Sequence, residues 1–116
     1  MGKLIAKREY VPDAGDIVWF MLYNTEGHEQ KGIRPAVVVT SKDFNSITNM
    51  LWLCPMTTSV KDYIFHVKTK FDGKDGVVMI DQLRSVNWRS RKMRKAGKIN
   101  QNIFNEIKEK IKGVIN

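Results

Sequence analysis

The chain has 116 residues, of which 42% are hydrophobic, and its net charge is +8 at pH 7. This length suits one folded domain and is too short for two, so we expect a single domain over residues 1–116. The single cysteine excludes an internal disulfide, no apolar run approaches the ~18 residues of a membrane span, and the first residues hold no secretory segment, so a cytoplasmic protein is expected.

Short apolar segments separated by polar loops fill the first 80 residues. Five of them are predicted to be β-strands: 16–22, 36–40, 50–54, 63–69 and 77–80. All but 63–69 lack a polar face, which indicates strands that are covered on both sides. Because proline has no N–H to donate, Pro35 belongs at the start or edge of its strand and Pro55 is expected to end the next one. Short, closely spaced strands with glycine-rich turns favour a closed or half-open barrel.

Helical signals occur at two places. Ser41 is a candidate N-cap for a short helical turn over residues 42–45. From residue 101 to 114, apolar residues recur at helical spacing and form one stripe, and Asn100 is a candidate N-cap. The predicted fold class is mostly β with α, a small antiparallel β-barrel closed by an amphipathic C-terminal helix.

Basic residues concentrate late in the chain. Seven of them, with no acidic residue between, occupy positions 84–98: Arg84, Arg89, Arg91, Lys92, Arg94, Lys95 and Lys98. A strongly basic domain attracts polyanions, which leaves nucleic acid, an anionic membrane surface or an acidic protein as partner classes. Trp88 lies among these cations, and this mixture of charge with an aromatic stacking surface favours nucleic acid.

Three blocks of sequence resemble a known family. The first is EYVPDAGDIVW with the following EGHEQKGIRPAVVVTS, the second is LCPMTTSVKDYIF, and the third is DGVVMIDQLRSVNWRSR with the KAGKI step. Together they resemble the MazF/PemK (Kid) toxin family over residues 9–116. The resemblance implies an SH3-like barrel of the CcdB/PemK type, a two-fold homodimer and a cognate acidic MazE-like antitoxin. It also implies a ribosome-independent mRNA interferase that cuts single-stranded RNA at short motifs, with ACA-like triplets expected.

The implied reaction determines which residue types the site needs. Metal-independent RNA cleavage uses the substrate's own 2′-hydroxyl as nucleophile and leaves a 2′,3′-cyclic phosphate and a 5′-hydroxyl. The enzyme must remove the hydroxyl proton, stabilise charge on the phosphate and protonate the leaving oxygen. The carboxylates of this chain are too dispersed in sequence to indicate a metal site, so neither a metal nor another cofactor is expected.

Arg34 is the first candidate for phosphate stabilisation. It precedes Pro35 at the start of a predicted strand, its guanidinium can donate two hydrogen bonds to phosphate oxygens, and the family has a functional arginine at this position. The alternative is a surface ion pair with Glu26 or Glu29. Thr57 matches the family's active-site threonine and can donate its hydroxyl to the same phosphate, although threonines also commonly cap turns.

Candidates for proton transfer lie in two motifs. His28 and Glu29 are the candidate acid or base of the GHEQ loop, since the plasmid-encoded branch of the family has a catalytic histidine there and other branches have serine. Gln30 is a candidate reader of a base edge. Asp81 matches a catalytic aspartate of the plasmid branch, but the arginine that precedes it there is Met79 here, so Asp81 is either catalytic or holds its loop.

RNA is expected to lie across Arg34, Thr57 and the basic stretch of residues 84–98. Tyr23 and Trp88 are candidate stacking surfaces, and Thr58 is expected to share the role of Thr57. Arg84, Arg89 and Arg91 are expected to bind the backbone. The loops at 23–33 and 56–63 are expected to set the recognised motif. His66 is interpreted as a structural or neutral residue on an exposed strand face.

Two other functions remain open from the sequence. A gyrase poison of the CcdB type shares the expected fold and performs no chemistry, so it has no need of Arg34 and the threonine pair. A non-catalytic nucleic-acid-binding barrel needs the basic stretch and tolerates the loss of those residues.

Overall fold

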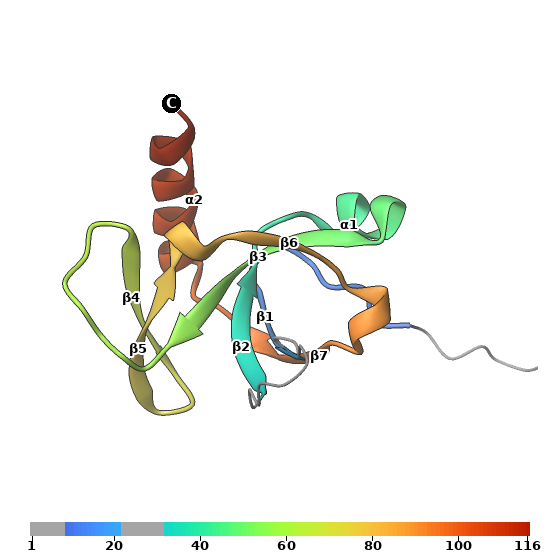
Figure 1. Ribbon diagram of the computed structural model, residues 1–116, viewed down its shortest axis with the longest axis horizontal. Helices are drawn as coiled ribbons and strands as arrows, with labels where there is room; N and C mark the ends of the chain where they lie inside the picture. The colour runs from blue at the N-terminus through green and yellow to red at the C-terminus, as the bar shows by residue number, and fades with distance from the viewer. Residues whose placement is uncertain (1–8, 22–31) are drawn as a thin grey trace, which may run out of the picture.

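The computed structural model describes residues 9–21 and 32–116, which form one curled antiparallel sheet with a helix against it (Figure 1). Its elements are β1 (Asp16–Met21), β2 (Ile33–Val38), α1 (Lys42–Thr48), β3 (Met50–Thr57), β4 (His66–Phe71), β5 (Lys74–Met79), η1 (Ile80–Gln82), β6 (Arg84–Asn87), η2 (Arg89–Arg91), β7 (Arg94–Lys98) and α2 (Gln101–Ile115). The strand order is β4-β5-β3-β2-β1-β7, and β6 pairs with β3. The predicted fold class is confirmed, with the sheet in the half-open form.

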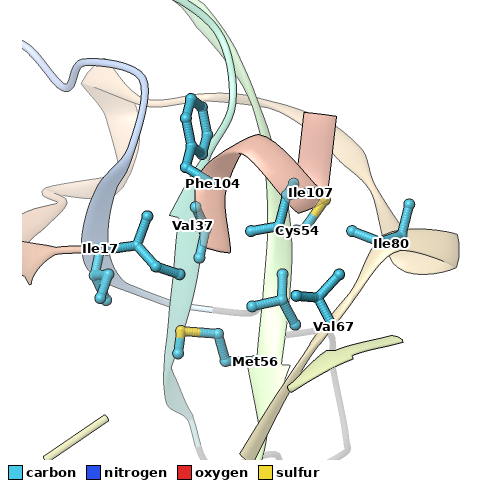
Figure 2. Close-up of a cluster of buried hydrophobic side chains, with 10 residues drawn as sticks. Ile17, Val37, Cys54, Met56, Val67, Ile80, Phe104 and Ile107 are labelled. Carbon is cyan, nitrogen blue, oxygen red and sulfur yellow. The ribbon is translucent and has the colours of Figure 1, made fainter. Parts of the chain in front are cut away.

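Apolar side chains cover both faces of the sheet. On one face, Val37 and Cys54 of the central strands pack with Phe104 and Ile107 of α2 (Figure 2). On the other face, residues that alternate with these form a second core: Val18, Phe20, Ala36, Val38, Leu51, Leu53, Val86 and Trp88. The absence of a polar face in the apolar segments is thereby explained, and each fully buried side chain contributes about 1.5–3 kcal/mol to folding.

The C-terminal helix follows its sequence signals closely. The Asn100 side-chain oxygen accepts hydrogen bonds from the backbone N–H groups of Asn102 at 2.8 Å and Ile103 at 3.2 Å. Phe104 and Ile107 are its buried residues, one helical turn apart, so the apolar stripe faces the sheet. Asn100 is confirmed as the N-cap, and α2 ends one residue later than predicted.

The first helix is longer than predicted. Ser41 caps it as expected, because its hydroxyl oxygen accepts from Phe44 N at 3.3 Å. The helix continues to Thr48, and Asn49 ends it in the left-handed conformation with φ 64°. The side chain of Asn45 is fully buried and donates to the carbonyl of Pro12 at 2.8 Å, which fixes α1 against the N-terminal segment.

The two prolines lie inside strands, and the prediction that Pro55 ends its strand was wrong. β3 continues to Thr57. Pro55 falls where β3 changes partner from β6, which ends its pairing at Leu53, to β5, which begins at Met56. A missing N–H costs least at such a gap in the ladder. Pro35 lies in the first half of β2, ahead of the residues that pair with β3.

Two strands of the basic stretch escaped prediction. β6 and β7 consist largely of charged and small residues, so they lack the apolar run that marks a strand. Buried residues anchor both strands, since Val86 within β6 and Ile99 directly after β7 belong to the two cores. Asp72 and Gly73 form the turn between the paired residues Phe71 and Lys74, with φ values of 56° and 76°.

Candidate functional site

Arg34 and Thr57 meet across two neighbouring strands. The β2–β3 register pairs Ala36 with Pro55, and two further residues along each strand bring Arg34 opposite Thr57. Side chains directly opposite each other share a sheet face. Arg34 is exposed and Thr57 half-buried. Both line one cleft of about 240 Å³, together with Thr58, so residues 23 positions apart in sequence come together as the family resemblance implies.

The Thr57 hydroxyl has one role that the structure records. Its oxygen accepts a hydrogen bond from Ser59 N at 3.2 Å, which is the turn-capping alternative considered from the sequence. A hydroxyl that accepts through a lone pair still has its proton to donate. Turn capping therefore fixes the Thr57 side chain and leaves its O–H available to a phosphate oxygen.

The cleft has an aromatic wall that sequence reasoning missed. Trp19 of β1 and Phe71 of β4 line it, with ring centroids 5.6 Å apart and ring planes at 61°. Trp19 is half-buried rather than enclosed. Its segment is apolar on both sides, so the sequence did not reveal that this ring lies at the end of the sheet. Its indole is the aromatic surface next to Arg34.

A larger, basic cavity adjoins the cleft at Trp19. Its volume is about 640 Å³, and three cations line it: Arg91, Lys92 and Arg94. Arg91 is anchored there, since its guanidinium donates to the carbonyl of Met21 at 3.1 Å. Because Trp19 lines both spaces, the cleft and the basic cavity form a continuous surface of aromatic and positive groups.

The other cations of the basic stretch are divided between structural and exposed positions. Arg89 binds both carboxylate oxygens of Glu9 at 2.6 Å and also donates to the Asn49 side chain. Lys95 and Lys98 lie 3.6 and 3.2 Å from the Asp16 carboxylate. Arg84 is exposed on β6, beside β3. The stretch is therefore not one uniform RNA-binding face, and Arg89 in particular has a structural partner.

The buried carboxylate of Asp16 organises the start of β1. Burial raises its pKa, but hydrogen bonds from the Tyr10 hydroxyl, Asp13 N and Lys98 outweigh that effect, so its pKa is lowered overall. Burial and the neighbouring Asp16 carboxylate raise the pKa of Tyr10, whose hydroxyl donates to Asp16 at 2.5 Å. This cluster stabilises the fold beside the basic cavity and stays charged at neutral pH.

The prediction that Trp88 stacks on RNA was wrong. Only 4% of Trp88 is exposed, and it belongs to the second core. Its indole N–H donates to the carbonyl of Asn45 at 2.9 Å, and the Arg89 guanidinium lies 4.4 Å from the ring centroid. Its faces are thus covered by protein. An aromatic residue within a charged segment can either stack on RNA or pack in the core, and the structure shows core packing for Trp88.

Asp81 lies in a different pocket from Arg34. It lies in the 3-10 helix η1 and lines a space of about 400 Å³ with His66 and Tyr63. His66 Nε2 is 3.9 Å from Asp81 Oδ1. The placement of His66 on an exposed face was wrong, because its side chain is only 11% exposed.

Four predicted site residues lie outside the described residues: Tyr23, His28, Glu29 and Gln30. Cys54 is fully buried, and burial together with Asp81 raises the pKa of its thiol to about 12, so it packs as a small apolar residue. Within residues 9–21 and 32–116, no group of three or more His, Cys, Asp and Glu side chains is placed to hold a metal ion. No helix of that same part of the chain is long and apolar enough to cross a membrane.

Comparison with known proteins agrees with this architecture. A chain of the MazE–MazF crystal structure from Deinococcus radiodurans superimposes with a TM-score of 0.84 at 36% identity, over 92% of this chain and 97% of that one. Endoribonuclease toxin MazF of Escherichia coli K12 is 41% identical over 106 residues, which cover 91% of this chain and 96% of that protein. Endoribonuclease PemK of Escherichia coli is 30% identical, over 92% of this chain and 84% of that protein.

The curled half-barrel with its C-terminal helix is the fold that this chain shares with the MazF crystal structures. Residues 13–115 match the family described as PemK-like, MazF-like toxin of type II toxin-antitoxin system. The chain belongs to this family, as the sequence motifs predicted, and the family includes endoribonucleases.

Proposed function

We propose that this chain is the toxin of a type II toxin–antitoxin pair and acts as a sequence-specific, ribosome-independent endoribonuclease on single-stranded mRNA. Residues 1–116 act as one catalytic domain, and the working form is a cytoplasmic homodimer. The proposal favours an enzyme over a gyrase poison or a passive RNA-binding barrel. The endoribonuclease relatives support it, and so does a cleft equipped for phosphate chemistry.

One observation carries the chemistry: Arg34 of β2 and Thr57 of β3 line one cleft, which Thr58 also lines. A guanidinium and two hydroxyls, all hydrogen-bond donors, line a cleft of about 240 Å³, which has room for a phosphate group. Such fixed donors stabilise the extra charge that develops on phosphoryl oxygens in the transition state. Because both residues come from paired strands, the donors are in place before substrate binds.

The reaction follows from these groups. The 2′-hydroxyl of the nucleotide before the scissile bond loses its proton to a base and attacks phosphorus. Arg34 and Thr57 hold the phosphoryl oxygens, and an acid protonates the leaving 5′-oxygen. The products are a 2′,3′-cyclic phosphate and a 5′-hydroxyl. His28 and Glu29 are the candidates for the base and the acid, whereas Asp81 lies in a separate pocket from Arg34 and Thr57. No metal ion takes part.

The path of the RNA follows the joined cavities. Trp19 offers a ring for base stacking beside the scissile phosphate, in place of the buried Trp88. Lys92 and Arg94 of the basic cavity bind the backbone on one side. Tyr23, Gln30 and the loop at 56–63 contribute to sequence recognition, with ACA-like triplets as the expected motif.

A net charge of +8 also determines the kind of inhibitor that fits. An acidic, MazE-like antitoxin with a flexible tail can fold onto the same positive surface and compete with RNA. The crystal structure of MazE–MazF from Deinococcus radiodurans supports this partner class.

The proposal is tested by incubating the purified protein with a defined RNA in the presence and absence of EDTA, and mapping both new ends. Cleavage that continues in EDTA and leaves cyclic phosphate and 5′-hydroxyl ends is expected. A matched RNA with one 2′-deoxy substitution before the scissile phosphate should bind and remain intact. Loss of activity on chelation with recovery in magnesium, or cutting of the 2′-deoxy substrate, contradicts the mechanism.

A further inference from the structure

A second pocket lies on the sheet face that carries Thr57. The registers pair Thr57 with Val77 and His66 with Met79, so alternation along β5 puts Thr57 and His66 on the same face. The Cα atoms of Thr57 and His66 are two strand spacings apart across the sheet and two residues apart along it, which amounts to about 12 Å. A single phosphate held by Thr57 does not span that distance, so a ligand in the second pocket belongs to a neighbouring nucleotide.

The pocket offers groups suited to a base rather than a phosphate. It has a volume of about 400 Å³, and its polar lining residues are Lys61, Asp62, Tyr63, His66, Asp81 and Gln82. Two acidic residues and one lysine line it, whereas the described residues that line the basic cavity near Trp19 include three cations and no acidic residue. The carboxylates repel a phosphate and attract N–H groups. A neutral nucleobase with N–H donors is the better match.

Asp81 is the acceptor that such a base needs. Its side chain is 38% exposed, and the one ion-pair partner recorded for it among the described residues is His66, at 3.9 Å. That distance is too long for a direct hydrogen bond and short enough for electrostatic attraction. The carboxylate oxygens thus remain available to accept from an exocyclic amino group, as acidic side chains do when they bind cytosine N4.

His66 lies beside the Asp81 carboxylate. Its Nδ1 is buried and has no hydrogen-bond partner among the described residues. A buried N–H without an acceptor is rarer than an unfilled lone pair, so the proton belongs on Nε2, the nitrogen nearest Asp81. The Nε2 N–H is thus the donor group nearest to the Asp81 carboxylate, 3.9 Å away, and contributes to the polar lining of the pocket.

Tyr63 supplies the stacking surface. It is 46% exposed, and its ring meets His66 and Phe65 edge to face, with centroids 4.9 and 5.9 Å away. These two contacts fix the plane of the phenol ring while leaving nearly half of the residue exposed. Unstacked RNA bases bind on such rings while polar groups read their edges.

We propose that the pocket of Tyr63, His66 and Asp81 binds the base of a nucleotide next to the scissile phosphate and selects a base with an exocyclic amino group. The inference rests on the proposed endoribonuclease function. Uracil has a carbonyl where cytosine has its amino group, and that carbonyl faces the Asp81 carboxylate unfavourably. Asp81 then determines specificity, His66 is a positioning residue, and neither contacts the reacting phosphate.

The test uses short RNAs made uncleavable by a 2′-deoxy substitution at the scissile position, so that binding is read without turnover. At each flanking position, cytidine is compared with uridine, and adenosine with purine riboside, which lacks the amino group. The wild-type protein is expected to prefer the amino-bearing base by roughly tenfold at one position. Asp81→Asn should lose most of that preference and keep its affinity for the remaining positions, because an amide both donates and accepts. Asp43→Asn, on exposed α1, is the control for the charge change.

Two further variants separate the residues' roles. Tyr63→Phe should keep affinity and selectivity, whereas Tyr63→Ala should lose affinity for all bases at that one position. His66→Gln should reduce selectivity less than Asp81→Asn does. Cleavage of a random RNA pool, with sequencing of the new ends, gives the parallel readout: Asp81→Asn relaxes one motif position at near wild-type rate. Equal rate loss on every motif makes Asp81 catalytic and overturns the inference, as does unchanged base preference. Absence of cleavage by the wild type contradicts the proposed function instead, and the binding measurements remain decisive for the pocket.

Discussion

Gly76 lies directly against the backbone carbonyl of Thr57: a Cβ atom built at position 76 would be 2.6 Å from that oxygen. The contact joins β5 to the last residue of β3, where the candidate phosphate-binding hydroxyls begin. A side chain at this point must move one of two backbones, since the obstacle is not a flexible group. The close approach of these strands thus fixes where Thr57 stands in the cleft.

Gly76→Ala is expected to displace Thr57 and to impair RNA cleavage more than the addition of one methyl group would suggest. Overpacking of this kind costs about 1–3 kcal/mol of folding free energy. Cleavage should fall further than that loss explains, because the donor opposite Arg34 shifts. Gly97→Ala is the control, since no atom lies within 4 Å of a Cβ there. Urea denaturation and single-turnover cleavage on both variants provide the measurement, and equal behaviour of the two proteins contradicts the proposed role of the contact.

Trp19 and Trp52 separate stacking on RNA from mere exposure of an aromatic ring. Trp19→Ala should weaken RNA binding by about 1–3 kcal/mol, the range found for one base stacked on an aromatic side chain. Trp52 is 41% exposed and packs on Phe44, away from the cleft. Trp52→Ala should therefore leave RNA affinity near the wild-type value. Filter binding to a non-cleavable RNA measures both, and a larger loss for Trp52→Ala would place the RNA on the other surface.

Lys92 and Arg94 are expected to carry the salt dependence of binding. Both line the basic cavity, and no ion pair is recorded for either within the described part of the chain. Replacing both with alanine should reduce the slope of log affinity against log salt by about 1.4, at ~0.7 per phosphate contact on a single strand. Turnover at saturating RNA should change little. Replacing Arg89 should instead lower stability, because Arg89 binds Glu9. An unchanged salt slope in the double variant refutes the assignment.

Asp16 predicts how stability depends on pH. Its pKa is lowered in the folded state relative to an unfolded aspartate, near ~3.9. A lowered pKa contributes stability above the unfolded value, and that contribution is lost as the pH falls through the folded value. The free energy of unfolding should therefore drop below about pH 4 more steeply in the wild type than in Asp16→Asn. At pH 7 the variant should be less stable by about 1–3 kcal/mol. Urea denaturation at pH 7 and pH 3 measures this, with Asp62→Asn as control, and parallel pH curves for wild type and Asp16→Asn contradict it.

The sequence predicted the parts of the fold that rest on apolar patterning. Five strands, the C-terminal helix and the caps at Ser41 and Asn100 follow from local chemistry, and the structure has them. β6 and β7 were missed because tertiary pairing, rather than their own composition, makes them strands. The prediction at Pro55 was wrong because this proline lies at the point where β3 changes partner from β6 to β5, and hydrogen bonding to those strands is interrupted there. The sequence around Pro55 does not show where that change occurs.

The candidate site was likewise predicted in part. Arg34 and Thr57 were found through family motifs, and the register explains why those motifs belong together. Trp88 is buried in the second core, whereas Trp19 lines the cleft. Whether an aromatic ring is buried depends on what packs against its face of the sheet, and neighbours in sequence do not reveal this. The pairing of His66 with Asp81 joins residues 15 positions apart through β4 and β5, and no local pattern announced it.

The most direct test of the whole account is single-turnover cleavage by Arg34→Ala, with RNA affinity measured in parallel. Loss of one donor that stabilises developing charge should cost about 3–4 kcal/mol, or roughly 10²–10³ in rate. Ground-state affinity should fall much less, because Trp19 and the basic cavity still hold the strand. Arg34→Lys should recover only part of the rate, since a single ammonium does not reproduce the two-pronged guanidinium contact. Circular dichroism confirms folding of each variant. If a folded Arg34→Ala cleaves RNA at a near wild-type rate, Arg34 does not stabilise the phosphate and the central claim is wrong.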